Sequence, residues 1–216
     1  MTRQANTTNE SFDGWQLFEA EAQYAESIFR NALGDVEASI AAARRAVEIK
    51  PDYAPAVLTM GSIEYQLGKE AEGRRLFRSL LLVPDQSKDL WEIVDKAGNF
   101  LIQSRRYADA LELYEGAVAR FPDRANLYQG LGCCAGHEGL FDRAVMAFQK
   151  ALDLEPVRQD LTNDLGWSLF EAGRLEEAEE VLLKAVTMDP SDELARENAR
   201  LCQAKLSESE NWRYGG

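Results

Sequence analysis

The strongest constraint on the fold is a pattern that returns with a period of about 34 residues in the second half of the chain, a length in the range of repeat architectures. The clearest copy contains Tyr128, Leu131, Gly132, Gly139, Ala144, Phe148, Ala151 and Pro156. The next copy contains Thr162, Leu165, Gly166, Gly173, Ala178, Leu182, Ala185 and Pro190, each one full period later. A fixed period of this length predicts a solenoid, in which each unit buries its apolar face against its neighbours.

The same pattern extends upstream with one irregular step. One small-residue position marks the register in every copy: Ser39, Gly73, Ala110, Ala144 and Ala178. The steps between these markers are equal except for the longer one from Gly73 to Ala110, so the stretch PDQSKDL holds the extra residues. We therefore expect a single solenoid over residues 15–206, with repeats at about 19–52, 53–86, 90–123, 124–157 and 158–191 and a capping helix at 192–206. Residues 1–14 are expected to be disordered and residues 207–216 to form a flexible tail.

Within each copy, glycine and proline indicate two helices. Glycine inside a helix costs about 1 kcal/mol relative to alanine, so the interior glycines predict a close helix contact that offsets this cost. These glycines are Gly61, Gly98, Gly132 and Gly166. A proline follows each second helix, because it lacks the amide donor and disfavours helix at the preceding residue. After Pro190, an amphipathic segment with Leu194, Leu201 and Cys202 on one side is expected to cover the last repeat.

These repeats resemble the tetratricopeptide repeat (TPR) family over roughly residues 19–190. The resemblance implies an all-α, right-handed superhelical solenoid of antiparallel helix pairs, whose first helices line a concave groove that binds peptides or partner helices. Carried onto this sequence, the groove lining is Tyr24, Ile28, Asn31, Leu58, Thr59, Ser62, Tyr65, Glu92, Asp95, Lys96, Asn99, Asn126, Gln129, Cys133, His137, Asp160, Asn163, Asp164 and Trp167.

The chemistry of these positions favours one kind of partner. Asn and Gln side chains can hydrogen-bond a peptide backbone, and Tyr65 and Trp167 can anchor apolar side chains. Family members that grip acidic chaperone tails use a clamp of Lys, Asn and Arg, and the matching positions here do not supply it. Carboxylates dominate instead, at Glu92, Asp95, Asp160 and Asp164. A neutral or basic segment is therefore favoured over an acidic one.

The stretch YQGLGCCAGHEG suggests a phosphate loop or a metal site at first sight. It falls on a first helix and its turn, however, and lacks the strand–loop–helix context of a nucleotide motif. Cys133 and His137 could share one helix face as half of a metal site, but the chain holds only one histidine and one other distant cysteine, Cys202. Cys134 is expected to face the core. We predict no metal, no cofactor and no enzymatic activity.

The charge balance narrows the partners further. The chain has 24 Lys and Arg against 37 Asp and Glu, a formal net charge of −13, which disfavours nucleic acid and anionic membranes as partners. No stretch has the length and hydropathy of a signal peptide or a membrane span. Three cysteines, two of them adjacent, make a poor disulfide framework. A cytoplasmic location fits these observations.

Two functions stay open. The first is a scaffold or adaptor that binds a peptide or helix of a partner protein in the groove; the second is a dedicated chaperone for a secreted or assembled client, because the repeats also resemble those of bacterial TPR secretion chaperones. Near the C-terminus, Trp212, Arg213 and Tyr214 form a possible docking motif. No stretch offers a heptad seam on which to base a prediction of self-association, so the oligomeric state stays open.

Overall fold

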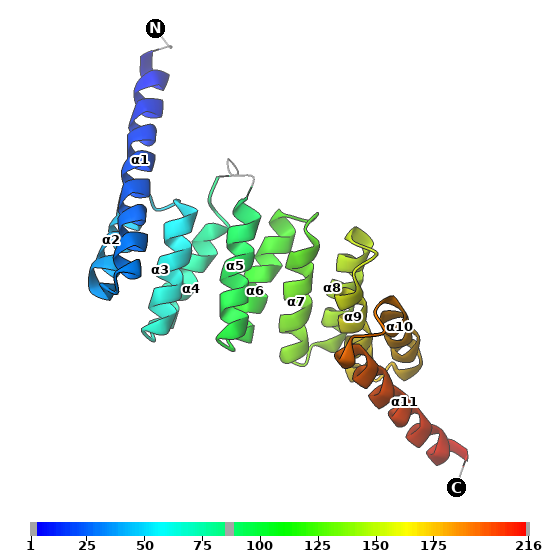
Figure 1. The fold of residues 1–216 in the computed structure, drawn as a ribbon. Helices are drawn as coiled ribbons and strands as arrows, with labels where there is room; N and C mark the ends of the chain where they lie inside the picture. The colour runs from blue at the N-terminus through cyan, green and yellow to red at the C-terminus, as the bar shows by residue number, and fades with distance from the viewer. Residues whose placement is uncertain (1–3, 85–88, 215–216) are drawn as a thin grey trace. The chain divides into compact units, whose positions relative to one another are not determined.

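The computed structural model describes the backbone of residues 4–84 and 89–214 and the side chains of residues 14–84 and 89–208. This part of the chain is all helical and contains no strand (Figure 1). Its helices are α1 (Gln4–Ala32), α2 (Val36–Ile49), α3 (Ala54–Gln66), α4 (Glu70–Leu80), α5 (Leu90–Gln103), α6 (Tyr107–Arg120), α7 (Ala125–His137), α8 (Phe141–Leu154), α9 (Gln159–Glu171), α10 (Leu175–Met188) and α11 (Glu193–Tyr214).

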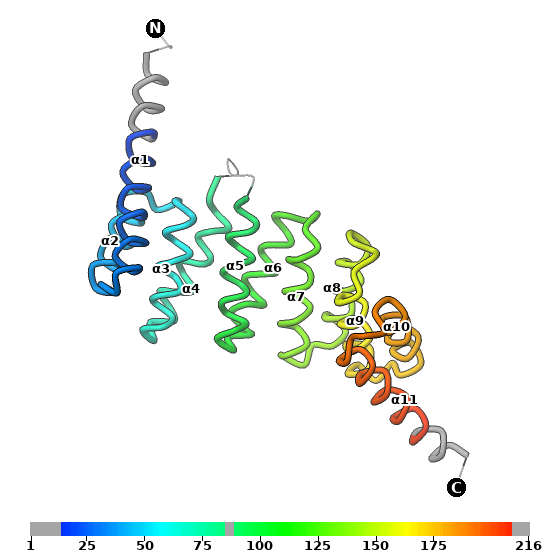
Figure 2. The backbone as a smooth tube through the Cα atoms, viewed as in Figure 1, coloured from blue at the N-terminus to red at the C-terminus, as the bar shows by residue number. Residues whose placement is uncertain are grey.

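The chain divides into two compact units, Met1–Phe100 and Leu101–Gly216, with the boundary inside α5. In the first unit α1 packs against α2 and α3 against α4, and in the second α7 packs against α8 and α9 against α10 (Figures 1 and 2). Each of these pairs is a hairpin of consecutive helices. The expectation of an all-α chain built from helix pairs is confirmed.

The turns inside the pairs repeat one backbone conformation. Gly34, Gly68, Gly139 and Gly173 have φ between 72° and 79°, a region that glycine enters without steric cost. In the second unit the amide of Gly139 donates to the carbonyl of Gly136, and the next amide donates to the carbonyl of Ala135. These bonds satisfy the last carbonyls of the first helix and end it.

Close packing between paired helices explains the interior glycines. A Cβ atom built on Gly61 would overlap the Phe77 ring, and one on Gly132 would lie 2.7 Å from the Phe148 ring. At Gly166 a Cβ atom would meet Leu182 at 2.7 Å. The side chain of the second helix therefore occupies the space that the glycine leaves open, which confirms the predicted contact at these three positions.

The core of each unit lies between its stacked pairs. In the first unit Val57, Phe77, Leu80 and Val94 are at most 1% exposed. In the second unit the small residues predicted to mark helix contacts are all fully buried: Ala144, Ala151, Ala178 and Ala185. None of the described helices is long and apolar enough to cross a membrane.

Helix α11 covers the last pair, with a correction to the predicted face. It packs on α10 and α9 through Ala195, Asn198, Ala199 and Cys202, all of which are buried. Leu194 is 62% exposed instead, because it lies one position, or about 100° of helical rotation, before the buried stripe that begins at Ala195.

The chain ends differ from expectation in helix length. Helix α11 continues to Tyr214, past the expected boundary at residue 206, and helix α1 begins at Gln4. The side chains of Trp212, Arg213 and Tyr214 lie outside the described residues, as do most of those in the segment 1–14 that was expected to be disordered.

Candidate functional site

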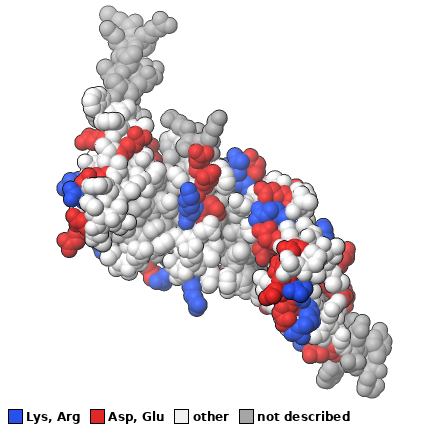
Figure 3. Space-filling view, viewed as in Figure 1, with Lys and Arg blue, Asp and Glu red and all other residues white. Residues whose placement is uncertain are grey.

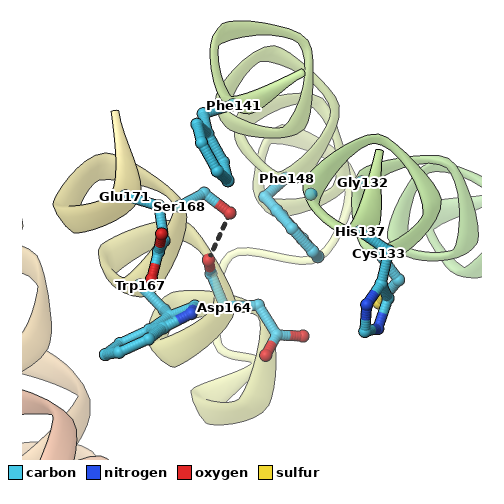
Figure 4. Close-up of a pocket in the computed structure, with 10 residues that line it drawn as sticks. Gly132, Cys133, His137, Phe141, Phe148, Asp164, Trp167, Ser168 and Glu171 are labelled. Carbon is cyan, nitrogen blue, oxygen red and sulfur yellow. Dashed lines mark hydrogen bonds between the residues drawn. The ribbon is translucent and has the colours of Figure 1, made fainter. Parts of the chain in front are cut away.

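A pocket of about 430 Å³ opens between α7, α8 and α9 in the second unit (Figure 4). Its lining is Gly132, Cys133, Gly136, His137, Phe141, Phe148, Asp164, Trp167, Ser168 and Glu171. Four of these residues were predicted as groove residues, namely Cys133, His137, Asp164 and Trp167. The structure therefore brings together in one pocket residues that lie on two successive first helices.

Helical spacing explains why α9 contributes four lining residues. Asp164, Trp167, Ser168 and Glu171 follow the i, i+3, i+4, i+7 pattern and so share one face of the helix. The hydroxyl of Ser168 donates to the backbone carbonyl of Asp164 at 2.8 Å (Figure 4). Its hydrogen is therefore already used within the helix and does not point to a ligand in the pocket. The Trp167 ring stacks on Phe170, with ring centroids 4.9 Å apart.

The opposite wall is shaped by small and aromatic residues. Gly132 and Gly136 present no side chain on α7, and the rings of Phe141 and Phe148 come from α8. Apolar walls of this kind lower the local dielectric, so that a charge in the pocket interacts more strongly than it would in water.

Asp164 is the carboxylate most affected by this environment. Burial raises its pKa from the ordinary value of 3.8 to about 6, the hydrogen bond from Gln129 opposes that shift, and the charge of Asp160 adds to it. The Nε2 atom of Gln129 donates to Asp164 at 3.5 Å and to Asp160 at 3.2 Å. A cation placed in the pocket would thus stabilise the ionised form of Asp164.

Arg158 organises the neighbouring surface. Its guanidinium binds Asp160 through Nε at 2.7 Å and Nη2 at 2.5 Å, and also reaches Glu155 at 2.7 Å. It donates to the amide oxygens of Asn126 at 3.2 Å and Gln129 at 3.0 Å. The guanidinium holds the pKa of Asp160 below its usual range. Arg158 is therefore engaged by residues of its own unit and is not left free for an anionic ligand.

The cysteines and the histidine do not form a reactive centre. Burial raises the pKa of Cys133 and of Cys134 to about 12, so both are thiols at neutral pH. Cys134 is fully buried, which confirms its predicted core position. The ring of His137 stacks on Tyr107 with centroids 3.9 Å apart. Among the residues that the structure describes, no group of three or more His, Cys, Asp or Glu side chains is arranged to hold a metal ion.

In the first unit some predicted groove residues contact a neighbouring helix and others contact residues of their own helix. The hydroxyls of Tyr24 on α1 and Thr59 on α3 lie 3.2 Å apart, which brings these two first helices together. Ile28 and Asn31 are exposed, and Leu58 and Ser62 are half-buried. On α5, Glu92, Lys96 and Asn99 are exposed and Asp95 is half-buried, with the Asn99 amide donating to Asp95 at 3.1 Å.

Two predicted groove residues lie in the interior. Tyr65 is 7% exposed and packs against Phe77 and Phe100, at centroid distances of 5.5 and 6.1 Å. Asn163 is 4% exposed and accepts a hydrogen bond from Asn198 on α11 at 3.0 Å. In the structure both side chains contribute to packing, so neither belongs to the exposed surface on which a partner would dock.

Sequence reasoning missed several residues of the pocket. Phe141, Ser168 and Glu171 line it, and Arg158 controls the charge beside it, yet none was predicted. Glu171 and Ser168 had a usable signal, because they stand seven and four positions after Asp164 on the same helix face. For Arg158 the nearby Glu155 and Asp160 were a weak signal, but its bonds to Asn126 and Gln129 depend on where α7 lies.

Comparison with known proteins identifies the family. The model of one tetratricopeptide repeat family matches residues 96–144 and 132–193, and the model of another matches residues 20–53, together more than half of the chain. The chain belongs to the tetratricopeptide repeat family. As a TPR protein it is 28% identical over 112 residues, 52% of the chain and 32% of the relative, to small glutamine-rich tetratricopeptide repeat-containing protein 2 of Mycosarcoma maydis.

A second relative aligns with more of this TPR chain. The peroxisomal targeting signal receptor of Debaryomyces hansenii is 27% identical over 190 residues, which cover 77% of the chain and 31% of the receptor. The chain thus spans about a third of the length of these curated relatives.

Solved structures share the fold at low identity. The crystal structure of YrrB, described as a TPR protein with an unusual peptide-binding site, aligns at a TM-score of 0.60 and 21% identity over 82% of this chain and 90% of that one. MamA aligns at a TM-score of 0.59 and 17% identity, covering 80% and 92%. The first TPR domain of Spaghetti (RPAP3), bound to the HSP90 peptide SRMEEVD, aligns at 0.52 and 18%, covering 54% and 93%. These likenesses confirm the predicted TPR-type solenoid fold.

Proposed function

We propose that this protein is an interaction scaffold whose second unit binds a segment of a partner protein across α7 and α9, with a Lys or Arg side chain of that segment in the pocket. The observation that carries the proposal is the carboxylate of Asp164, which sits in a partly apolar pocket beside Trp167 and Glu171. A cation there would pair with the carboxylate and lie near an aromatic ring, and both interactions strengthen away from water.

The contrast with a peptide-bound relative supports the preference for basic segments. The peptide SRMEEVD, bound to the Spaghetti TPR domain, ends in acidic residues. In this chain Asp160, Asp164 and Glu171 stand at the site, and Arg158 is already bound to Asp160 and Glu155. On the face that Figure 3 shows, acidic and basic side chains are intermixed over α8 to α11.

A pair of synthetic peptides tests the proposal. Both are short and neutral except for one central residue, which is Lys in one peptide and Glu in the other, and their affinities for the full chain are measured by fluorescence anisotropy. We expect the Lys peptide to bind more tightly, and Asp164→Asn to weaken its binding by about tenfold, because a charge-assisted pair is lost. Trp167→Ala should also weaken it.

Glu180→Gln is the matched control, because Glu180 is an exposed carboxylate on α10 outside the pocket. Its affinity for the Lys peptide should stay within about twofold of wild type. Tighter binding of the Glu peptide, or equal loss in Asp164→Asn and Glu180→Gln, would contradict the proposed site.

Adaptor and chaperone functions differ in whether the bound segment is part of a folded partner or of an aggregation-prone client. An adaptor holds two folded proteins at once, whereas a chaperone keeps one aggregation-prone client soluble. We propose the adaptor, without enzymatic activity, because a pocket that takes one side chain recognises a short defined segment, which a folded partner can present. Light scattering of a client with and without this protein separates the two: suppression of aggregation that Asp164→Asn abolishes would favour the chaperone.

A further inference from the structure

Helix α1 carries an exposed apolar stripe that the family groove does not include. Its members repeat with alternating steps of three and four positions: Trp15, Phe18, Ala22, Ala25, Phe29 and Ala32. All six are exposed, with Trp15 at 72%, Phe18 at 64% and Phe29 at 56%. These positions follow the a and d spacing of a coiled coil.

The opposite side of α1 is the one that packs on its own unit. Ala20 is fully buried and Ser27 is 2% exposed. The Ser27 hydroxyl lies 3.2 Å from that of Ser39 on α2, and Ser39 Oγ donates to the Ser27 carbonyl at 2.9 Å. Because these contacts fix the rotation of α1 against α2, the apolar stripe points away from the pair.

The stripe has the shape of a surface that receives another helix. Two large side chains stand at one end and Phe29 at the other, with Ala22 and Ala25 between them. Small residues in the middle let a second helix approach closely, and the aromatic residues provide the area to bury. Leu33 and Val36, at 64% and 56% exposure, extend the apolar surface into the turn. Contiguous exposed apolar residues of this kind mark interaction sites on soluble proteins.

The charges beside the stripe decide what can cover it. Glu19 and Glu21 occupy the e and g positions that flank the seam, and both are exposed. The third flanking carboxylate, Glu26, is bound by Arg30 at 2.6 Å. In Figure 3 acidic side chains stand beside uncharged surface on α1. A second copy of this chain would bring like charges together at the flanks, on top of a net charge of −13 for each copy.

We propose that this stripe, named here the α1 seam and defined by Trp15, Phe18, Ala22, Ala25, Phe29 and Ala32, docks an amphipathic helix of a different protein whose apolar seam is flanked by Lys or Arg. The seam lies within the first unit and shares no residue with the pocket of the second unit. It would therefore give the scaffold a second, independent binding surface.

Two synthetic helical peptides of about four heptads test the seam. Both carry Leu at a and d; one carries Lys at e and g and the other Glu, so each repels its own copies. The full chain should bind the Lys peptide at least about tenfold more tightly than the Glu peptide, because of the flanking carboxylates. The double variant Glu19→Lys/Glu21→Lys should reverse this preference.

Matched variants separate the seam from other surfaces. Phe18→Glu should weaken binding of the Lys peptide by at least about tenfold. In the complex the peptide covers the Phe18 ring, and the variant places a charge there instead. Met146→Glu on α8, equally a change of an exposed apolar helix residue, should leave it unchanged. Asp164→Asn should also leave it unchanged, which distinguishes the seam from the pocket. Circular dichroism checks that each variant keeps its helices.

Three results would overturn the inference. One is equal or tighter binding of the Glu peptide. Another is loss of binding in Asp164→Asn but not in Phe18→Glu, which would place the peptide in the pocket. The third is a dimer of the wild-type chain in sedimentation that Phe18→Glu dissociates, because the seam would then belong to a second copy.

Discussion

Arg105 adopts in its turn the same left-handed backbone conformation as Gly139 one repeat later, with φ of 57° and 72°. The amides around both residues make the same bonds, from Arg105 to Ile102 and from Arg106 to Leu101. A residue with a Cβ is strained in this region, whereas glycine is not. The third turn is therefore the one turn of this kind, among the described residues, that lacks the glycine.

Arg105→Gly should raise the free energy of unfolding by about 0.5–1 kcal/mol, because relief of this strain exceeds the extra unfolded-state entropy of glycine. Urea denaturation of the full chain measures the change. Gly139→Ala is the reverse control and should lower the free energy by about 1 kcal/mol. A loss of stability in Arg105→Gly would show that the arginine side chain contributes more than its backbone strain costs.

Ala144→Leu should destabilise the second unit by about 1–3 kcal/mol, because Ala144 is fully buried at the contact between helices and a larger side chain overpacks it. The melting midpoint reports the change. Ala204→Leu, on the exposed side of α11, is the control and should stay within about 0.5 kcal/mol of wild type. Equal midpoints for the two variants would count against the packing described here.

Asn198→Ala should lower the free energy of unfolding by about 1–3 kcal/mol, because it leaves the buried amide oxygen of Asn163 without its donor. Replacing both asparagines with leucine should recover stability to within about 1 kcal/mol of wild type, since no polar group is then left unpaired. Chemical denaturation of the two variants side by side is the measurement. A double variant as unstable as the single one would mean that packing, not the hydrogen bond, sets the cost.

Asp164→Asn should stabilise the protein near neutral pH and have little effect in acid. Burial raises the folded-state pKa of Asp164 from 3.8 to about 6, so the folded protein binds the proton more tightly than the unfolded chain does. The stabilisation that comes from protonating Asp164 is fully present below its unfolded-state pKa of 3.8. It is lost as the pH rises through the folded-state pKa of about 6. At about pH 8 the free energy of unfolding of the variant should exceed that of wild type by about 1–2 kcal/mol, a value reduced for partial solvent screening. At about pH 4 the two free energies should be nearly equal. A gain that does not change with pH would contradict the shifted pKa.

The repeat pattern predicted the helices and their contacts well, because it depends on local rules. Glycine at the turn, alanine at the helix contact and proline after the second helix each act through the backbone or a single neighbour. The positions of Gly139, Ala144 and Pro156 therefore followed from the sequence. Charges that gather on successive first helices were also predictable, and Asp164 and Trp167 do share a pocket.

The depth of individual side chains was not predictable from the same pattern. Tyr65 was expected in the groove, but its ring fills space that Gly73 on the paired helix leaves open, where a Cβ atom would lie 2.5 Å from it. Asn163 is buried because α11 supplies Asn198. Both outcomes depend on what stands opposite a residue in three dimensions, which helical spacing alone does not give. The α1 seam was missed for the same reason, since spacing does not tell an exposed apolar stripe from a buried one.

The glycine contacts inside the helix pairs also bear on how the chain folds. Gly61 with Phe77, Gly132 with Phe148, and Gly166 with Leu182 each join the two consecutive helices of one hairpin, at the same short separation along the chain. Each hairpin thus contains both halves of this close contact, and closing it requires only a short loop. Short-range contacts of this kind give a low contact order and fast folding. A helix pair consequently needs no residue of another repeat to form this contact, although its apolar faces are buried only when the neighbouring repeats stack on it.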